Sequence, residues 1–414
     1  MTGQVRERTN CRLCDAADLE TVLSLLPTPA ANAFVRDLAP PAADDAIPLQ
    51  LDLCRRCGHI QSRFAPDPYA LYGRGIDRHA ASPTTMRRLG GLADDVITRL
   101  RPAEGALAVH VGANDGSLLA LLEDAGRRTH AIEPAVDAAT EASNRGISVF
   151  PGFLAPPIAA RMVEERGPAF AVIATEGFGP ALDPTQMIEG AKRLLAPDGA
   201  LVLELPAAAA LRDEAAFDLV SHRHPDYGAI GPVARALDAH GLTPFAARLL
   251  PTPDRRLRVF AQMPGGLFED DGSVAAAEAA DQASGLGTAV GWSRLQAQVD
   301  AIAGEARRRL RELAEAGSII VGYGTTAAAT TLAHQLGIDR FMMAAIIGDE
   351  TWKQGLLTPG LRIPVVPAGE LARLKPDWIV VLARDDAESI VERLTPMCAS
   401  GTRFLLPFDP AEAV

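Results

Sequence analysis

Four of the five cysteines lie in two short pairs, and their spacing is the strongest chemical signal in the sequence. Two residues separate Cys11 from Cys14, and two separate Cys54 from Cys57. Such a gap on a tight turn lets both sulfurs of a pair point at one ion, and two pairs supply the four ligands of a closed tetrahedral zinc site. Because a closed site has no open coordination position, we expect this zinc to stabilise structure and not to catalyse.

A glycine-rich turn, Gly112-Ala113-Asn114-Asp115-Gly116, is the second chemical signal. It follows a predicted strand over residues 106–111 and precedes a predicted helix that begins at Ser117. A strand, a glycine turn and a helix in this order bring a cofactor to the carboxyl edge of a parallel sheet. Glu133 ends the next predicted strand about twenty residues later, where a carboxylate can accept hydrogen bonds from a ribose diol.

The residue types in this turn favour S-adenosylmethionine (SAM) over a dinucleotide. Asn114 stands where a dinucleotide-binding turn needs its second glycine, and Asp115 adds a negative charge that would repel a pyrophosphate. SAM has no phosphate and carries a sulfonium and an ammonium group, so a carboxylate in the turn is acceptable. The predicted cofactor-binding residues are Gly112, Asn114, Asp115, Gly116, Glu133, Pro134 and Thr175.

The elements that must position these residues alternate between strand and helix, which indicates an α/β protein. A chain of 414 residues is too long for one hydrophobic core, so we expect several domains. We predict a zinc-binding domain over 1–66, with an irregular loop at 26–34 and a strand at 47–53. A doubly wound SAM-dependent methyltransferase domain follows over 67–295, and a Rossmann-like domain over 296–414 completes the chain.

Composition excludes several classes of function. The net charge of -12 argues against nucleic acid, since phosphate contacts need clustered Lys and Arg. The first residues lack the apolar core of a signal peptide, and the longest apolar runs are too short to span a membrane. We therefore expect a cytoplasmic protein with no membrane partner, in which five cysteines do not form a disulfide framework.

Motifs along nearly the whole chain resemble one family. They are CRLC at 11–14, LCRRCGHIQ at 53–61, VGANDGSLL at 111–119, AIEP at 131–134, VGYG at 321–324 and KQG at 353–355. In this order they are similar to the bacterial nucleotide-sugar C-methyltransferases, which act on TDP-linked 4-keto-deoxysugars. The resemblance implies a SAM-dependent C-methyltransferase of secondary-metabolite sugar biosynthesis with a structural zinc. It also implies a nucleotide-diphosphate sugar, TDP-linked in this family, as substrate, and a monomer or weak dimer.

The resemblance also implies a catalytic base. In this family a histidine removes the proton beside the 4-keto group, and the enolate carbon then attacks the sulfonium methyl. The matching position here is His224, and the ordinary pKa of histidine suits the task. His222 stands two residues away and is an alternative base, while Tyr227 is a candidate donor to the enolate oxygen.

The C-terminal region carries the predicted substrate-binding residues. A strand at 318–321, a tight turn at 322–324 and a helix at 325–336 place backbone N–H groups where an anion can bind. Lys353, which follows a strand predicted over 344–349, is a reasonable phosphate partner. The predicted set is these C-terminal residues, Tyr323, Thr325 and Lys353, together with Arg258 of the central domain.

Several positions depart from the family pattern. They are Ser221 and Arg223 before the base, His110, Thr175, Pro180, Ala328, and the stretch Tyr72–His79, which is poor in tyrosine. These departures keep two alternatives open. One is a nucleotide-sugar epimerase, isomerase or ketoreductase that has lost or supplemented methyl transfer, and the other is a degenerate binding partner of another sugar enzyme. The retained turn and Glu133 argue against the second.

Overall fold

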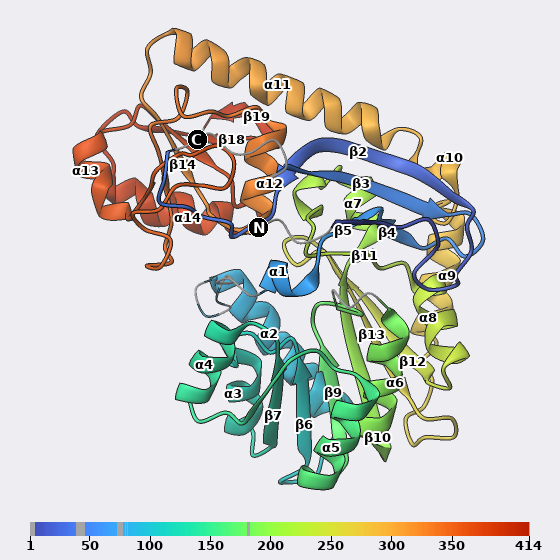
Figure 1. The fold of residues 1–414 in the computed structure, drawn as a ribbon. Coiled ribbons are helices and arrows are strands. Elements are labelled where there is room, and N and C mark those ends of the chain that lie inside the picture. Colours follow the sequence, from blue (N-terminus) through green and yellow to red (C-terminus); the bar gives the residue numbers. More distant parts are fainter. Residues whose placement is uncertain are drawn as a thin grey trace.

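Three main sheets organise the chain (Figure 1). The computed structural model describes residues 5–38, 46–72, 78, 80, 82–179 and 183–413. Residues 73–77 and 79 of the tyrosine-poor stretch and Pro180 therefore lie outside the described residues. Within the described residues, no helix is both long and apolar enough to cross a membrane.

The central sheet has seven strands in the order β12-β13-β10-β9-β6-β7-β8. The five strands from β10 to β8 run parallel, and β13 and β12 add an antiparallel edge. The parallel strands are short runs of Val, Ile, Leu and Ala, as expected for strands buried on both faces. The strands are β6 (Leu107–Val111), β7 (Arg128–Glu133), β8 (Val149–Pro151), β9 (Ala169–Ala174), β10 (Leu195–Pro206), β12 (Thr243–Leu250) and β13 (Arg256–Gln262).

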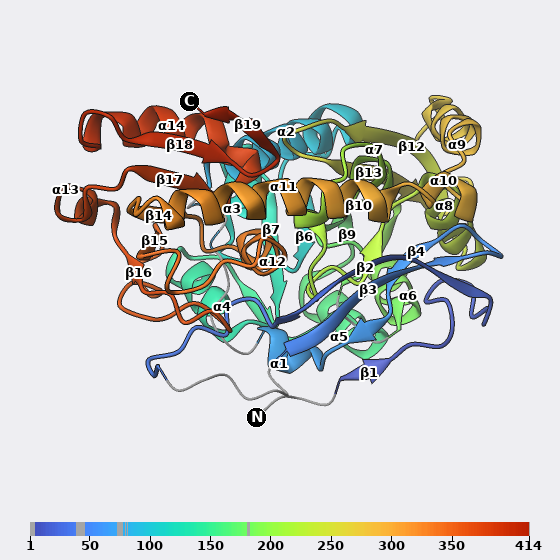
Figure 2. The same cartoon turned by 90° about the horizontal axis from the view of Figure 1, so that it is seen from above.

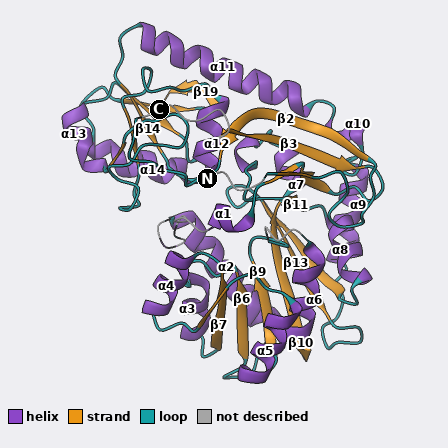
Figure 3. Ribbon diagram, viewed as in Figure 1, coloured by secondary structure: helices purple, strands orange, loops and turns teal. Residues whose placement is uncertain are grey.

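Helices cover both faces of this sheet (Figure 3). Alternate residues of each strand point to opposite faces, so two separate hydrophobic cores form. One core contains α2 (Pro83–Leu100), α3 (Ser117–Asp124) and α4 (Val136–Asn144), and the other contains α5 (Pro156–Arg166), α6 (Pro184–Leu194) and α8 (Ile230–Ala239). This arrangement confirms the predicted doubly wound α/β class.

The N-terminal sheet has four strands in the order β11-β4-β3-β2. They are β2 (Leu19–Pro29), β3 (Ala46–Cys54), β4 (Ile60–Ser62) and β11 (Asp226–Tyr227). The strand predicted at 47–53 is confirmed, but the irregular loop predicted at 26–34 is wrong for its first part, because β2 extends to Pro29. Its register shifts between Leu25 and Thr28, and such a bulge accommodates the prolines. Gln335 also bonds both backbone groups of Leu26.

The C-terminal sheet has six strands in the order β16-β15-β14-β17-β18-β19. All pairs are parallel except that between β18 and β19. The strands are β14 (Ile320–Tyr323), β15 (Ala345–Ile347), β16 (Val365–Val366), β17 (Trp378–Val381), β18 (Arg403–Leu406) and β19 (Asp409–Ala413), and the helices are α12 (Ala327–Gln335), α13 (Leu371–Leu374) and α14 (Ala387–Leu394). The sheet confirms the predicted C-terminal Rossmann-like unit.

One helix joins the N-terminal and C-terminal sheets. Figure 2 shows α11 (Leu295–Glu315) extending across both. Its apolar face belongs to a hydrophobic core that also contains Leu23 and Leu51 of the N-terminal sheet and Ile320 and Ile346 of the C-terminal sheet. The two sheets therefore depend on each other for burial, and the domain limits at 66 and 295 stay a prediction.

The remaining α-helices and β-strands are β1 (Arg6–Glu7), β5 (Phe64–Ala65), α1 (Pro68–Tyr72), α7 (Ala208–Asp213), α9 (Ser273–Ala283) and α10 (Ala289–Trp292).

Candidate active site

The four paired cysteines meet at one point beside the N-terminal sheet. The Sγ atoms of Cys11 and Cys57 lie 3.6 Å apart, as do those of Cys14 and Cys54, and all four lie within 4.8 Å of one another. Zn–S bonds of 2.3 Å in a tetrahedron place sulfurs about 3.8 Å apart, so the cluster fits a zinc ion. The four ligands leave no open position, as predicted for a structural site.

Charged side chains tie this cluster to the segment that carries the predicted base. Asp226 Oδ1 lies 2.7 Å from Arg12 Nε and 3.0 Å from His59 Nε2. Burial would raise the pKa of Asp226, but the charge of Arg12 and the hydrogen bond with His59 outweigh it and lower that pKa. Arg12 also donates to the carbonyl of Gly179, beyond the end of β9. The segments that carry the zinc ligands therefore hold both β11 and the loop that follows β9.

The glycine turn between β6 and α3 uses its own backbone donors internally. The N–H groups of Gly112 and Ala113 both donate to Ile132 O, and the N–H of Asn114 donates to Glu133 Oε2 at 2.7 Å. The N–H of Asp115 donates to the Asn114 side chain. None of these four groups is left to bind a phosphate, which supports the exclusion of a dinucleotide.

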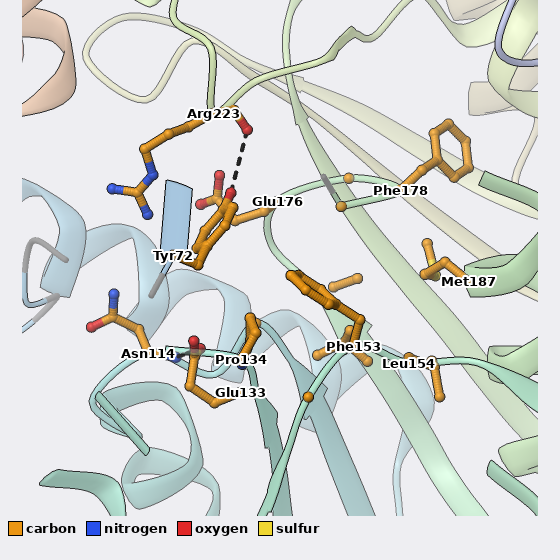
Figure 4. Close-up of a pocket in the computed structure, with 16 residues that line it drawn as sticks. Tyr72, Asn114, Glu133, Pro134, Phe153, Leu154, Glu176, Phe178, Met187 and Arg223 are labelled. Atoms are coloured by element: carbon orange, nitrogen blue, oxygen red, sulfur yellow. Dashed lines mark hydrogen bonds between the residues drawn. The ribbon is translucent and has the colours of Figure 1, made fainter. Parts of the chain in front are cut away.

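Glu133 lies at the polar end of a pocket beside this turn (Figure 4). Its Oε1 accepts from the N–H of Ala135 at 2.8 Å. Burial raises the pKa of Glu133, and these backbone donors oppose the rise. Each carboxylate oxygen has a second lone pair, so Glu133 can still accept from a ribose diol.

The other side of the same pocket is apolar. The side chains that line it there are mostly hydrophobic. The apolar wall suits a purine ring and the polar wall suits a ribose and an amino-acid group, so the residues fit SAM. The apolar lining consists of Pro134, Phe153, Leu154, Phe178 and Met187.

Three predicted cofactor residues lie behind the pocket wall. Asp115 accepts from the N–H and hydroxyl of Ser117 and from the N–H of Ala80, so it stabilises the start of α3. A Cβ on Gly116 would lie 2.3 Å from Ile147 Cδ1, so that glycine serves close packing. Thr175 is buried and its hydroxyl contacts His110 Nε2. Predicted residues Gly112, Asn114, Glu133 and Pro134 do line the pocket.

A second and larger cavity of about 430 Å³ lies between the central sheet and the C-terminal sheet. It receives residues from the start of α2, from the segment 218–224, from 253–256 and from the loops after β14, β15 and β17. Asn114, Glu176 and Arg223 line both this cavity and the cofactor pocket. The two spaces therefore meet at these three residues.

The comparisons with known proteins agree with this geometry. Residues 11–72 match the model of a zinc binding domain, and residues 256–409 match that of the C-methyltransferase C-terminal domain. C-methyltransferase NovU of Streptomyces niveus is 26% identical over 416 residues, which cover 100% of this chain and 99% of the relative. The chain is thus similar to C-methyltransferases along its whole length. Its pocket residues fit SAM, and its four paired cysteines fit a structural zinc.

Solved methyltransferase structures match more weakly. The glycopeptide N-methyltransferase MtfA, in complex with SAM, is 16% identical, with coverage of 42% of this chain and 94% of that chain and a TM-score of 0.34. An O-methyltransferase family protein from Burkholderia thailandensis is 18% identical, with coverage of 43% and 57% and a TM-score of 0.35.

Among the predicted catalytic residues, His224 lines the larger cavity. Its Nε2 lies 3.2 Å from Glu176 Oε2, and its Nδ1 lies 3.1 Å from Leu219 O. Arg256 NH2 is 3.6 Å from the other oxygen of Glu176. Burial would raise the pKa of Glu176, but the charge of Arg256 and the hydrogen bond with His224 hold it well below its usual range.

The other two predicted catalytic residues are buried beside the N-terminal sheet, and neither lines the two cavities. His222 Nε2 lies 3.3 Å from Pro48 O, and burial lowers the pKa of His222 to about 4. The hydroxyl of Tyr227 donates to Leu219 O and accepts from the N–H of Ser221. Burial raises the pKa of Tyr227. These contacts hold the loop around His224 rather than face a ligand.

Of the four predicted substrate residues, three line the larger cavity and one lies outside both cavities. Tyr323, Thr325 and Lys353 line the larger cavity. Lys353 Nζ donates to Thr325 O at 2.8 Å, so much of its role is to hold the turn before α12. Arg258 lies outside both cavities, because it is buried in ion pairs with Glu204 and Asp95.

The prediction missed Glu176, which borders both spaces. It directly follows β9, and the carboxyl ends of parallel strands are where α/β proteins place ligand contacts. That rule was available from the sequence and points to this carboxylate. The apolar pocket residues Phe153 and Met187 have no such signal, because apolar side chains in a connecting segment and a helix resemble ordinary core.

Proposed function

We propose that this protein transfers a methyl group from SAM to the carbon beside the keto group of a TDP-4-keto-deoxysugar, in the cytosol, during the synthesis of a secondary-metabolite sugar. The observation that carries this proposal is the meeting of the cofactor pocket and the larger cavity, with His224 and Glu176 at the junction. Carbon methylation needs a base at such a junction, since a C–H proton must leave before the carbon can attack.

The residues at the junction suit this proton transfer. A neutral His224 that donates from Nδ1 to Leu219 O keeps Nε2 as its basic atom. Nε2 donates to Glu176, the hydrogen bond that lowers the pKa of that carboxyl, only after it has taken the proton, and the carboxylate then stabilises the imidazolium. The electron pair of the broken C–H bond moves onto the carbonyl oxygen. The sulfonium of bound SAM supplies an electrophilic methyl group.

The larger cavity is suited to the rest of the substrate. Thr325 lies on the turn before α12, whose first N–H groups can bind an anion. Arg393 and Arg384 border the same space from beyond β17. We propose that the C-terminal sheet holds the nucleotide diphosphate there and that the keto sugar extends to the junction.

Incubation with SAM and a panel of TDP-4-keto-deoxysugars tests the proposal. We expect one substrate to gain the mass of one methylene group, with formation of S-adenosylhomocysteine. Deuterium uptake from heavy water with no gain of mass from SAM would instead favour the epimerase or isomerase alternative. Neither change with any sugar would contradict the substrate class.

A further inference from the structure

Three polar side chains from separate segments contact one another in a row at the junction. His224 Nε2 lies 3.2 Å from Glu176 Oε2, and Arg256 NH2 lies 3.6 Å from Glu176 Oε1. Arg256 also donates from NH1 to Thr175 O at 2.9 Å. The guanidinium therefore contacts the two consecutive residues that follow β9, one through its backbone and one through its side chain. These contacts place Glu176 between a cation and the proposed base.

The position of Arg256 on its strand brings it to this place. Arg256 is the first residue of β13, and it lines the larger cavity together with Glu176 and His224. Arg258 stands two residues further along and so lies on the same face of the strand. Arg258, however, is buried in ion pairs with Glu204 and Asp95. Of these two arginines, the one at the end of the strand reaches the junction.

Glu176 must be ionised to stabilise a protonated His224, and burial opposes that charge. Burial would raise the pKa of Glu176, because a carboxyl group away from water favours its neutral form. The charge of Arg256 is the largest of the effects that lower this pKa, ahead of those of His224 and Arg223. The effects of His224 exist only once it holds the proton. Arg256 is therefore the main group that keeps Glu176 charged before the reaction begins.

Other ionisable groups surround these contacts and also act on them. They are Tyr72, Glu133 and Arg223 beside Glu176, and Arg88, Glu204 and Asp385 beside Arg256. A variant that changes Arg256 or Glu176 alone leaves all the others in place. The change that it causes in the pH dependence of activity then reports on the charge that was removed.

We propose that Arg256 is a positioning residue for the reaction, which holds Glu176 beside His224 as a carboxylate so that the protonated base is stabilised. This inference rests on the proposed function. Arg256 takes up no proton and acts through Glu176. The C–H proton goes to His224 Nε2 and its electron pair to the carbonyl oxygen. The enolate carbon then attacks the methyl group of SAM, the electron pair of the broken S–C bond stays on sulfur, and the imidazolium releases its proton to water.

The test compares the wild type with Arg256→Gln, Arg256→Lys and Glu176→Gln. The measurements are the pH dependence of α-proton exchange without SAM and of kcat and KM for methyl transfer, with thermal unfolding as a check of folding. The probe is TDP-4-keto-6-deoxyglucose or whichever panel sugar the wild type accepts. Arg248→Gln is the matched control, because Arg248 pairs with Asp95 at 3.7 Å on the neighbouring strand β12 and lines neither cavity.

Arg256→Gln should move the acid limb of the pH profile to higher pH. The active pair has a neutral His224 and an ionised Glu176, so activity is lost when the pair takes up one proton. Removal of a nearby positive charge makes the pair bind that proton more tightly. We expect a shift of about one pH unit or more, which is about a tenfold loss of rate on the limb. Arg256→Lys keeps the charge and should restore most of the wild-type limb, and Arg248→Gln should match the wild type.

Glu176→Gln should move the same limb in the opposite direction, to lower pH. It removes a negative charge that stabilises the protonated His224, so the remaining base takes up its proton less readily. The rate above the limb should also fall, because the imidazolium formed in the reaction loses its partner. Opposite shifts in the two variants would not follow from loss of structure alone. Glu176→Gln also tests the inference if Arg256→Gln does not fold.

Two outcomes would overturn the inference while the proposed function stands. In one, the wild type is active and Arg256→Gln keeps the wild-type acid limb, with or without a higher KM. In the other, Glu176→Gln keeps that limb, which would mean that Glu176 is already protonated beside Arg256. A wild type that neither exchanges a proton nor transfers a methyl group with any keto sugar would instead contradict the proposed function, and this inference with it.

Discussion

The short segment from His224 to Asp226 contacts both the zinc module and the cavity junction. The polar groups of these two sites have different partners. Near one end, Asp226 meets Arg12 and His59, and all three are buried. Near the other end, His224 meets Glu176, and both border open space. The first arrangement pairs charged groups among themselves, whereas the second presents them to a ligand. A site that stabilises the fold and the proposed catalytic site therefore lie within a few residues of each other along the chain.

The same contrast divides the arginines of the central domain. Arg258 is buried between Glu204 and Asp95, so its charge is used for stability. Arg223 borders both cavities. A charged side chain near an active site is therefore assigned by its partners and by the space it faces, and not by its charge alone.

The largest effect is expected from loss of the zinc. Cys54→Ser removes one of four ligands, and zinc binding supplies much of the folding free energy of such small modules. We expect the free energy of unfolding to fall by several kcal/mol and the zinc content to drop well below one ion per chain, by metal analysis and thermal unfolding. Cys398→Ser, outside the cluster, is the control and should change neither quantity.

A quadruple cysteine variant sharpens this comparison. Zinc that remained stoichiometric after replacement of all four ligands would place the metal elsewhere. We also expect the Cys54→Ser variant to lose methyl transfer, because the Asp226 contacts that hold the segment of His224 depend on the zinc module.

The next effect concerns the buried ion pairs of the central sheet. Burial would raise the pKa of Glu204, but the charges of Arg88 and Arg258 lower it below the ordinary value of 4.5. A carboxylate whose pKa is lower in the folded state stabilises the fold above its unfolded pKa, and this contribution is lost as the pH falls through the folded value. Glu204→Gln should therefore lower the free energy of unfolding at pH 7 by about 3–5 kcal/mol.

The pH dependence of unfolding checks the sign of this effect. The difference between Glu204→Gln and the wild type should shrink as the pH falls below the ordinary value of 4.5, where the unfolded carboxylate takes up a proton, and disappear below the lower pKa of the folded state. Glu165→Gln is the control, since Glu165 pairs with Arg161 on the surface and its loss should change the free energy of unfolding little. An equal effect of the two variants at pH 7 would contradict the structural role of the pair.

Local spacing explains which parts of the site could be predicted from the sequence. The two cysteine pairs, Asn114 and Glu133 each follow from a turn and the strand beside it, so their geometry is nearly fixed by short stretches of chain. The order of strands and helices likewise predicted the central and C-terminal sheets, because buried parallel strands have a distinct apolar pattern.

The junction could not be predicted in the same way. Glu176, Arg223 and Arg256 come from three separate segments, and only the folded sheet brings them together. Arg258 was predicted to bind substrate but is buried in ion pairs with Glu204 and Asp95. The sequence does not show which arginine of β13 lies at the cavity end of the strand. The pairing of β11 with β4, which holds the segment of His224, is equally non-local.

Replacement of the proposed base should have the third largest effect. His224→Gln removes the basic nitrogen while it keeps a polar side chain, so we expect kcat and the rate of α-proton exchange to fall by about 100-fold or more, with little change in KM. His240→Gln, a partly exposed histidine that also contacts a glutamate, is the matched control. Exchange that survives in His224→Gln and vanishes in His222→Gln would move the base by two residues, despite the burial of His222.

The smallest effect is expected in the cofactor pocket. Glu133→Gln keeps the shape of the side chain but removes its charge, and it leaves one N–H of the turn or of Ala135 with a weaker acceptor. We expect SAM affinity to fall by roughly 1.5–3 kcal/mol, the cost of losing a charged partner for hydrogen-bonded hydroxyls. Calorimetry with SAM and S-adenosylhomocysteine measures the change, and Glu123→Gln on the surface of α3 is the control.

The same titration with NAD should show no binding, because the N–H groups at the start of the turn already have acceptors within the protein. NAD that bound while SAM did not would reverse the assignment of the turn, and equal SAM affinity in Glu133→Gln and the wild type would leave Glu133 with a role in holding the turn alone.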